Sequence, residues 1–152
     1  ISACLVGSEM CIRDRDYLGM GPGTYHDSIF LPNSSQLADF NGPHEKSWGF
    51  FYALDLGKLD ALQVPGASVQ LRYVRGSGAD GSHLDRTSPY AYYASGEKHW
   101  ESDVDLRYVV QSGSARNLAI RLRYAVHRMT QGTSGASSNQ FRLIFEYPLP
   151  IF

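Results

Sequence analysis

The chain has 152 residues, of which 43% are hydrophobic, and a formal net charge of -1. This length suits one domain with its own core. The near-neutral net charge does not indicate the basic surface of a nucleic-acid-binding protein. No apolar run approaches the roughly 18 residues of a membrane-spanning helix, although a membrane-spanning strand needs only about 9–11.

The first fifteen residues, ISACLVGSEMCIRDR, resemble a translated sequencing adapter, so we expect residues 1–15 to take no part in the fold. A genuine amphipathic lead-in is the alternative. Both cysteines, Cys4 and Cys11, lie here, which leaves the remaining chain without a disulfide framework or a thiol metal site. Residues 1–6 are too short for a signal peptide, and without an initiating Met a fragment is the simplest expectation.

Alternating polar and apolar side chains begin at Lys46, after a polar, Gly- and Pro-containing stretch at 16–45 that predicts a loop region. A period of two predicts strands with one apolar face each. We expect five of them, at about 46–55, 67–75, 98–111, 117–130 and 140–151. A helix would mix the arginines and aliphatic side chains of residues 118–126 around its surface.

The predicted connections alternate in length. A short Gly/Ser-rich turn at 112–116 contrasts with long polar loops at 76–96 and 131–139. Bacterial outer-membrane barrels have short periplasmic turns and longer outer loops. We therefore predict an all-β fold, an antiparallel meander with the long loops on the outer side. Five strands cannot close a barrel, so this chain should form an open, curved sheet with unpaired edges at 46–55 and at the last strand.

The apolar faces carry few charges and several tyrosines, which suit a membrane boundary. The sequence places these near strand ends, at Tyr52, Tyr73, Tyr108, Tyr124 and Tyr147. Periodicity alone leaves a soluble β-sandwich binding module as the alternative, in which the tyrosines would line the rim of a core.

The opposite faces are rich in arginine, whose planar cation binds carboxylates. We predict that these side chains line a pore for anionic groups, balanced by three acidic residues; the alternative is simple solvated charge. The candidates are Arg72, Arg107, Arg121, Arg123, Arg142, Asp103, Asp105 and Glu146.

The chain ends on an amphipathic segment, FRLIFEYPLPIF, with Phe152 as its last residue. A terminal aromatic residue of this kind is a signal for the barrel-assembly machinery, so Phe152 is our candidate assembly signal. Pro148 and Pro150 are unusual in a strand, because proline removes a donor from the ladder.

Four further segments carry a specific resemblance: SIFLPNSSQLADFNGPHEKSW, VPGASVQLRYVRG, KHWESDVDLRYVVQSG and RLIFEYPL. In this order and spacing, across about residues 16–152, they resemble the C-terminal region of the OprD family of outer-membrane porins. The resemblance implies that 46–152 is the C-terminal part of an eighteen-stranded, monomeric barrel in outer-membrane lipid, and that 16–45 is the extracellular-loop region before its first strand here. It also implies passive uptake of basic amino acids, peptides or small carboxylates such as aromatic acids, guided by arginines on the barrel wall.

No motif indicates an enzyme, a metal site or a cofactor. The glycine cluster at 19–23 lacks the spacing of a nucleotide-binding loop, and no pairing of Ser, His and Asp supports a triad. The five histidines are scattered without metal-ligand spacing. We expect His127 at an exposed position, where its strand meets the outer interface.

Overall fold

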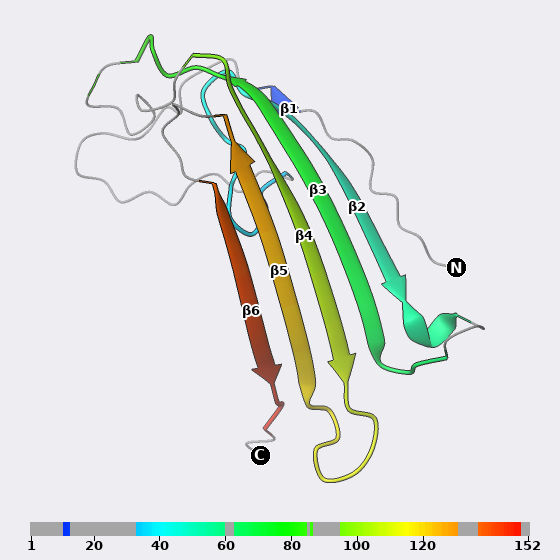
Figure 1. Ribbon diagram of the computed structural model, residues 1–152. Helices are drawn as coiled ribbons and strands as arrows, with labels where there is room; N and C mark the ends of the chain where they lie inside the picture. The colour runs from blue at the N-terminus through cyan, green and yellow to red at the C-terminus, as the bar shows by residue number, and fades with distance from the viewer. Residues whose placement is uncertain are drawn as a thin grey trace.

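One antiparallel sheet, with its strands in chain order, makes up the described protein (Figure 1). The computed structural model describes residues 11–12, 33–59, 63–84, 86, 95–130 and 137–149. The strands are β1 (Cys11–Ile12), β2 (Lys46–Asp55), β3 (Ala67–Ala79), β4 (Glu97–Val109), β5 (Ala119–Met129) and β6 (Ser138–Glu146), with a short 3-10 helix, η1 (Leu56–Lys58), after β2. The sheet is open, with β1 and β6 at its two ends, so the predicted all-β, open antiparallel meander is confirmed. In this part of the chain no helix is long and apolar enough to cross a membrane.

The strand bounds differ most from the predicted ranges at the ends of β3 and β6. β3 continues to Ala79, beyond the predicted end at 75. β6 ends at Glu146 instead of 151, because Pro148 has no N–H for the ladder. Residues 150–152, including Phe152, lie outside the described residues.

Two of the first fifteen residues, which we left out of the predicted fold, lie in the sheet. Cys11 and Ile12 pair with Ser47 and Lys46. The predicted bare edge along β2 is therefore covered at its first two residues, and the remainder of that edge has no strand partner among the described residues.

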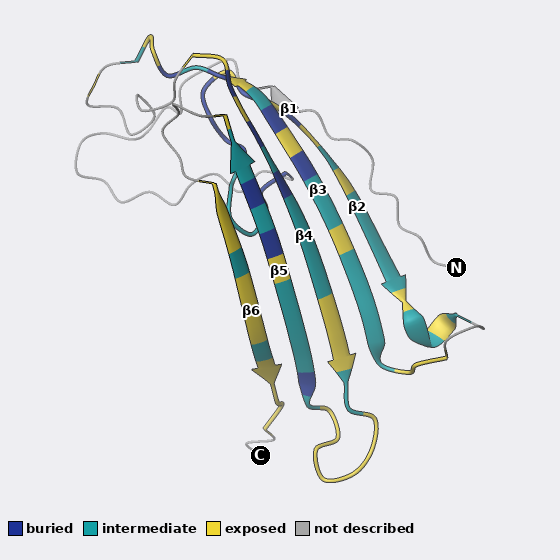
Figure 2. Ribbon diagram, in the orientation of Figure 1, coloured by how far each residue is buried: buried dark blue, intermediate teal, exposed yellow. Residues whose placement is uncertain are grey.

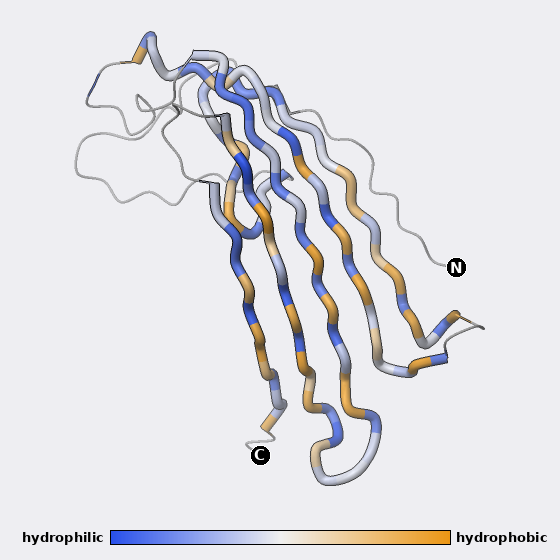
Figure 3. Tube along the Cα trace, in the orientation of Figure 1, coloured by the Kyte–Doolittle hydropathy of each residue, from blue (hydrophilic) through white to orange (hydrophobic). Residues whose placement is uncertain are grey.

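The register separates the sheet into two faces. On the face that we call apolar, aligned positions are occupied by aliphatic and aromatic side chains, for example Leu54, Val69, Leu106, Leu122 and Leu143 in adjacent strands. None of the described residues covers this face, and its exposed large side chains include Leu71, Leu106, Tyr124, Phe141, Leu143 and Phe145. Figure 3 shows the resulting alternation of orange and blue along each strand. A soluble sandwich would bury such a face against a second sheet.

The tyrosines of the apolar face do not all lie near strand ends. Tyr108 pairs with Ala67 at one end of the sheet, but Tyr73 is the central residue of β3 and Tyr124 is the central residue of β5. The predicted position near a strand end is therefore wrong for Tyr73 and Tyr124.

The two ends of the sheet differ. We call the end with connections 56–66 and 110–118 the turn end, and the end with 80–96 and 130–137 the loop end. At the turn end Gly66 has φ +83°, and a Cβ there would lie 2.5 Å from Val109 O. The backbones pack this closely because Val109 N donates a hydrogen bond to Gly66 O at 2.9 Å.

Residues 33–45, which we call the inner segment, lie across the other face, the polar face, at the loop end (Figure 1). Asn33 Nδ2 donates to Ser47 Oγ of β2 at 2.9 Å, and Gln36 Nε2 donates to Gln140 Oε1 of β6 at 3.1 Å. Figure 2 shows that the buried residues gather at this end of the sheet. The inner segment therefore supplies most of the covering that the polar face has.

Candidate functional site

All eight predicted pore-lining side chains lie at polar-face positions of β3 to β6. Arg72 is aligned with Asp103, and Arg107 with Arg121. Arg142 is aligned with Arg123, and Glu146 with Ala119. The five arginines come from four strands, and only the strict two-residue alternation of strand side chains brings them to one surface.

Asp105 joins two of these arginines. Arg121 Nε donates to Asp105 Oδ1 at 2.8 Å and to Oδ2 at 2.7 Å, while Arg123 Nε donates to Oδ2 at 2.5 Å. The carboxylate side chain is 13% exposed, so these charge-assisted bonds are partly shielded from water. Two guanidinium groups share one carboxylate, which leaves the group with a net positive charge and fixes both arginine side chains.

A cavity of about 210 Å³ lies between the arginines and the inner segment. On the sheet it is lined by Arg72, Arg123, Asp103 and Asp105, among others, and on the inner segment by residues 34–36. The cavity thus has cationic, anionic and neutral hydrogen-bonding groups around one polar space. A second, larger space of about 500 Å³ lies toward the turn end and is lined in part by Arg107 and Gln111.

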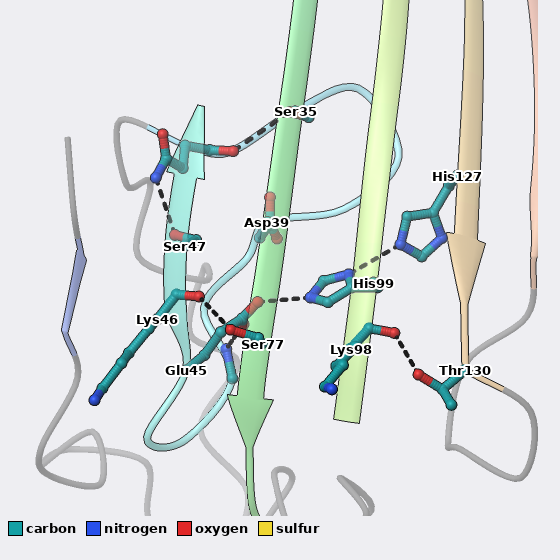
Figure 4. A network of polar contacts seen from close by, with 12 residues as sticks. Ser35, Asp39, Glu45, Lys46, Ser47, Ser77, Lys98, His99, His127 and Thr130 are labelled. Carbon is teal, nitrogen blue, oxygen red and sulfur yellow. Dashed lines mark hydrogen bonds and ion pairs between the residues drawn. The ribbon is translucent and has the colours of Figure 1, made fainter. Parts of the chain in front are cut away.

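A buried polar chain fixes the inner segment to the sheet (Figure 4). His99 Nε2 lies 2.6 Å from Glu45 Oε1, and His99 Nδ1 lies 3.0 Å from His127 Nε2. Glu45 Oε2 also accepts a hydrogen bond from Gly42 N at 2.8 Å. A proton on Nε2 of each histidine gives every one of these contacts a donor and an acceptor.

Aromatic stacking and one further carboxylate extend this attachment. The Phe40 ring stacks on His99, with centroids 4.3 Å apart and an interplanar angle of 12°. Leu37 N donates to Glu101 Oε1 at 2.8 Å. The inner segment is therefore held by hydrogen bonds and packing to β2, β4 and β6.

The sequence did not reveal this attachment, and the prediction for His127 was wrong. His127 is 6% exposed, because it points to the polar face under Phe40 instead of toward the outer interface. The available signal was strand phase: residues 99, 101 and 127 share the parity of the arginine positions in β4 and β5. No group of three or more His, Cys, Asp or Glu side chains within the described ranges could hold a metal ion.

Asp80 closes the base of the β3–β4 connection. Its Oδ1 accepts from Ser82 N at 2.9 Å and from Ser82 Oγ at 2.6 Å, and its Oδ2 accepts from Ser95 Oγ at 3.1 Å. The hydrogen bonds from the Ser82 side chain and backbone lower the pKa of Asp80 from its ordinary 3.8. Because this pKa is lowered, the stabilisation from these hydrogen bonds is fully present above pH 3.8 and is lost as the pH falls through the lowered pKa.

We therefore expect the Ser82 amide to be better protected from hydrogen exchange in the wild type than in an Asp80→Asn variant at neutral pH. The difference should vanish as the pH falls through the lowered pKa, because both proteins then carry an uncharged side chain. A difference that is unaffected by acid would show that the carboxylate charge does not hold the connection.

An amphipathic antiparallel sheet with an uncovered apolar face and a charged opposite face has the construction of an outer-membrane β-barrel wall. The sequence pattern described as outer membrane porin, OprD family, matches residues 14–151. Porin D of Pseudomonas aeruginosa is 44% identical over 142 residues, which are 90% of this chain and 31% of that protein.

Solved structures also superpose on this chain. The crystal structure of Pseudomonas aeruginosa OprD superposes with a TM-score of 0.74 and 43% identity, covering 83% of this chain and 33% of that one. OccK10 (OpdN) of the same species gives a TM-score of 0.65 and 36% identity, covering 81% of this chain and 31% of that one. The chain belongs to the OprD family of outer membrane porins, whose members lie in the outer membrane of Gram-negative bacteria. It spans about a third of the length of these relatives.

Proposed function

We propose that this chain forms part of the wall of a substrate-selective porin that passes small carboxylate-bearing solutes, such as amino acids, peptides or aromatic acids. The observation that carries the proposal is the arginine cluster on the polar face, with Arg121 and Arg123 fixed by Asp105. A charged wall selects ions by its field and by the width of the pore. Fixed guanidinium forks present donors to a carboxylate without losing further side-chain freedom.

The other parts of the chain would have distinct roles in such a porin. The uncovered apolar face would contact outer-membrane lipid, and partner strands from outside this chain would pair with β6 and the rest of β2 to close a monomeric eighteen-stranded barrel. The long connections and the inner segment would then lie on the extracellular side, where the inner segment narrows the pore. Phe152 would serve the assembly machinery.

Replacing both Arg121 and Arg123 by glutamine in the full-length protein is expected to lower the anion-to-cation permeability ratio by about fivefold. The reason is that each unit charge about 8 Å from a passing ion in water contributes about 0.5 kcal/mol, with opposite sign for anions and cations. Screening at about 0.1 M salt roughly halves each contribution, and Asp105 is left without its two cationic partners. The ratio is measured from the reversal potential in a salt gradient across a planar bilayer, together with uptake of a labelled carboxylate into vesicles.

The matched control is Lys58→Gln/Arg116→Gln, which removes the same two charges from exposed positions at the turn end. It should leave both measurements unchanged. Unaltered anion preference and uptake in the Arg121→Gln/Arg123→Gln variant would end the proposal that these arginines guide substrate.

A further inference from the structure

The apolar face carries charge at one end only. Among its positions in β2 to β6, four side chains are charged and all four are basic: Lys46, Arg75, Lys98 and Arg128. They occupy the two rows nearest the loop end, where Figure 3 shows hydrophilic positions beyond the alternating region. A random distribution of surface charge would include acidic residues and would not stop at one end.

The two arginines alternate with tryptophans in a single row. Trp48, Arg75, Trp100 and Arg128 are aligned across β2, β3, β4 and β5. Tyr73, on the row below, lies 5.6 Å from Trp48 and 6.0 Å from Trp100, measured between ring centroids. Aromatic rings with polar tips are typical of the membrane–water boundary.

Arg128 is held in place by acceptors on its own strand and on the neighbouring strand β6. Its Nη1 donates to Asn139 Oδ1 at 2.7 Å and to the backbone oxygens of His127 and Ser138 at 2.8 Å and 3.2 Å. Arg75 is exposed. One guanidinium is thus fixed at the sheet surface and a second lies two strands away on the same row.

The height of this row suits a headgroup position. Arg75 and Ala67, the residue of β3 at the turn end, are eight residues apart, which corresponds to about 26 Å along a strand. A strand tilt of about 35–45° reduces this to a height of about 18–21 Å, and the apolar band of an outer-membrane barrel is about 25 Å tall. When Ala67 and Tyr108 lie at one boundary, the backbone of the arginine row therefore lies a few ångströms below the other, and the long arginine side chains reach the headgroups from there.

We propose that Arg75 and Arg128, assisted by Lys46 and Lys98, bind the phosphate groups of the glycolipid that forms the outer leaflet of the Gram-negative outer membrane. Guanidinium forks match phosphate oxygens, the lysines add point charges, and the adjacent indole and phenol rings cover the sugar and upper acyl region. The orientation, with the loop end outward, rests on the proposed porin function. Because the four side chains lie on the face opposite the pore arginines, the two proposals depend on different residues.

Binding is tested with the full-length protein in detergent, by native mass spectrometry with diphosphoryl lipid A, monophosphoryl lipid A and phosphatidylethanolamine as competing probes. The wild type is expected to retain diphosphoryl lipid A in preference to the other two. Each basic residue near a charged lipid surface contributes about fivefold in affinity, so Arg75→Gln/Arg128→Gln should weaken retention by about 25-fold. Arg75→Lys/Arg128→Lys, which keeps the charge but loses the fork, should lie between the two.

The matched control is Lys58→Gln/Arg116→Gln, which removes two exposed basic residues at the turn end and should retain lipid A like the wild type. Equal retention by Arg75→Gln/Arg128→Gln and the wild type overturns the inference, as does an equal loss in the control.

Ion selectivity is recorded for the same variants. Lost lipid binding together with wild-type anion preference supports the inference. Lost anion preference would show that these side chains reach the pore, and it would overturn their assignment to the outer face. The porin proposal is tested separately, by the anion preference and uptake of the Arg121→Gln/Arg123→Gln variant.

Discussion

Replacing Gly76 by valine is expected to release the inner segment from the pore wall and to raise single-channel conductance. Gly76 lies in β3 directly beneath the buried polar chain. A Cβ at this position would overlap Glu45 Oε1, and would lie 2.8 Å from His99 Nε2 and 2.9 Å from Phe40 Cδ1. All three are attachment points of the inner segment, so the added side chain and the segment cannot occupy the same space.

Overpacking of this kind costs about 1–3 kcal/mol, and moving a loop away from the sheet is easier than distorting β3 between two paired strands. Conductance should increase by about twofold, since it follows the open width of the pore. Planar-bilayer recordings of the full-length protein would measure it.

The control is Ser77→Val, the next residue on β3, whose side chain lies on the apolar face and makes only a 3.5 Å contact with Lys46 O. Its conductance should equal that of the wild type. Glu45→Ala, which removes a partner of His99 without adding bulk, should change conductance in the same direction as Gly76→Val but by less. Wild-type conductance in both Gly76→Val and Glu45→Ala would mean that the inner segment does not narrow the pore.

Strand phase was enough to predict which arginines share a face. Once the period of two is recognised, Arg121 and Arg123 must point the same way, and the antiparallel pairing of successive strands brings Arg107 and Arg142 to the same surface. The fold class followed from the same period of two, because the residue types indicated which face of each strand is apolar and which is polar.

The inner segment could not be predicted in the same way. Residues 33–45 have no period, and the contacts that hold them are long-range: Gln36 reaches Gln140, and Glu45 reaches His99. His127 was assigned to an exposed position because its strand was expected to meet the outer interface there, although its own parity in β5 matches that of Arg123. A polar residue at a pore-facing position can be buried by a loop, and no local sequence pattern predicts that the loop covers it.

Replacing Asp105 by asparagine is expected to raise the anion-to-cation permeability ratio of the full-length protein by about two- to threefold. The carboxylate accepts bonds from both Arg121 and Arg123, so its removal leaves two cations without their shared counter-charge. A unit charge about 8 Å from a passing ion in water changes the ion's energy by about 0.5 kcal/mol, with opposite sign for anions and cations, and screening at about 0.1 M salt roughly halves this change. High salt should reduce the effect, since the Debye length falls to about 3 Å at 1 M.

Two further variants separate charge from geometry. Asp105→Glu keeps the charge and should keep the wild-type permeability ratio if the net charge of the wall sets selectivity. Asp105→Asn/Arg123→Gln restores the wild-type net charge but removes one fixed guanidinium. If selectivity among inorganic ions follows net charge, this double variant should return to the wild-type ratio, while uptake of a carboxylate solute stays low because one fork is missing. A double variant that kept the raised anion preference of Asp105→Asn would instead show that Arg121 alone dominates the field along this wall.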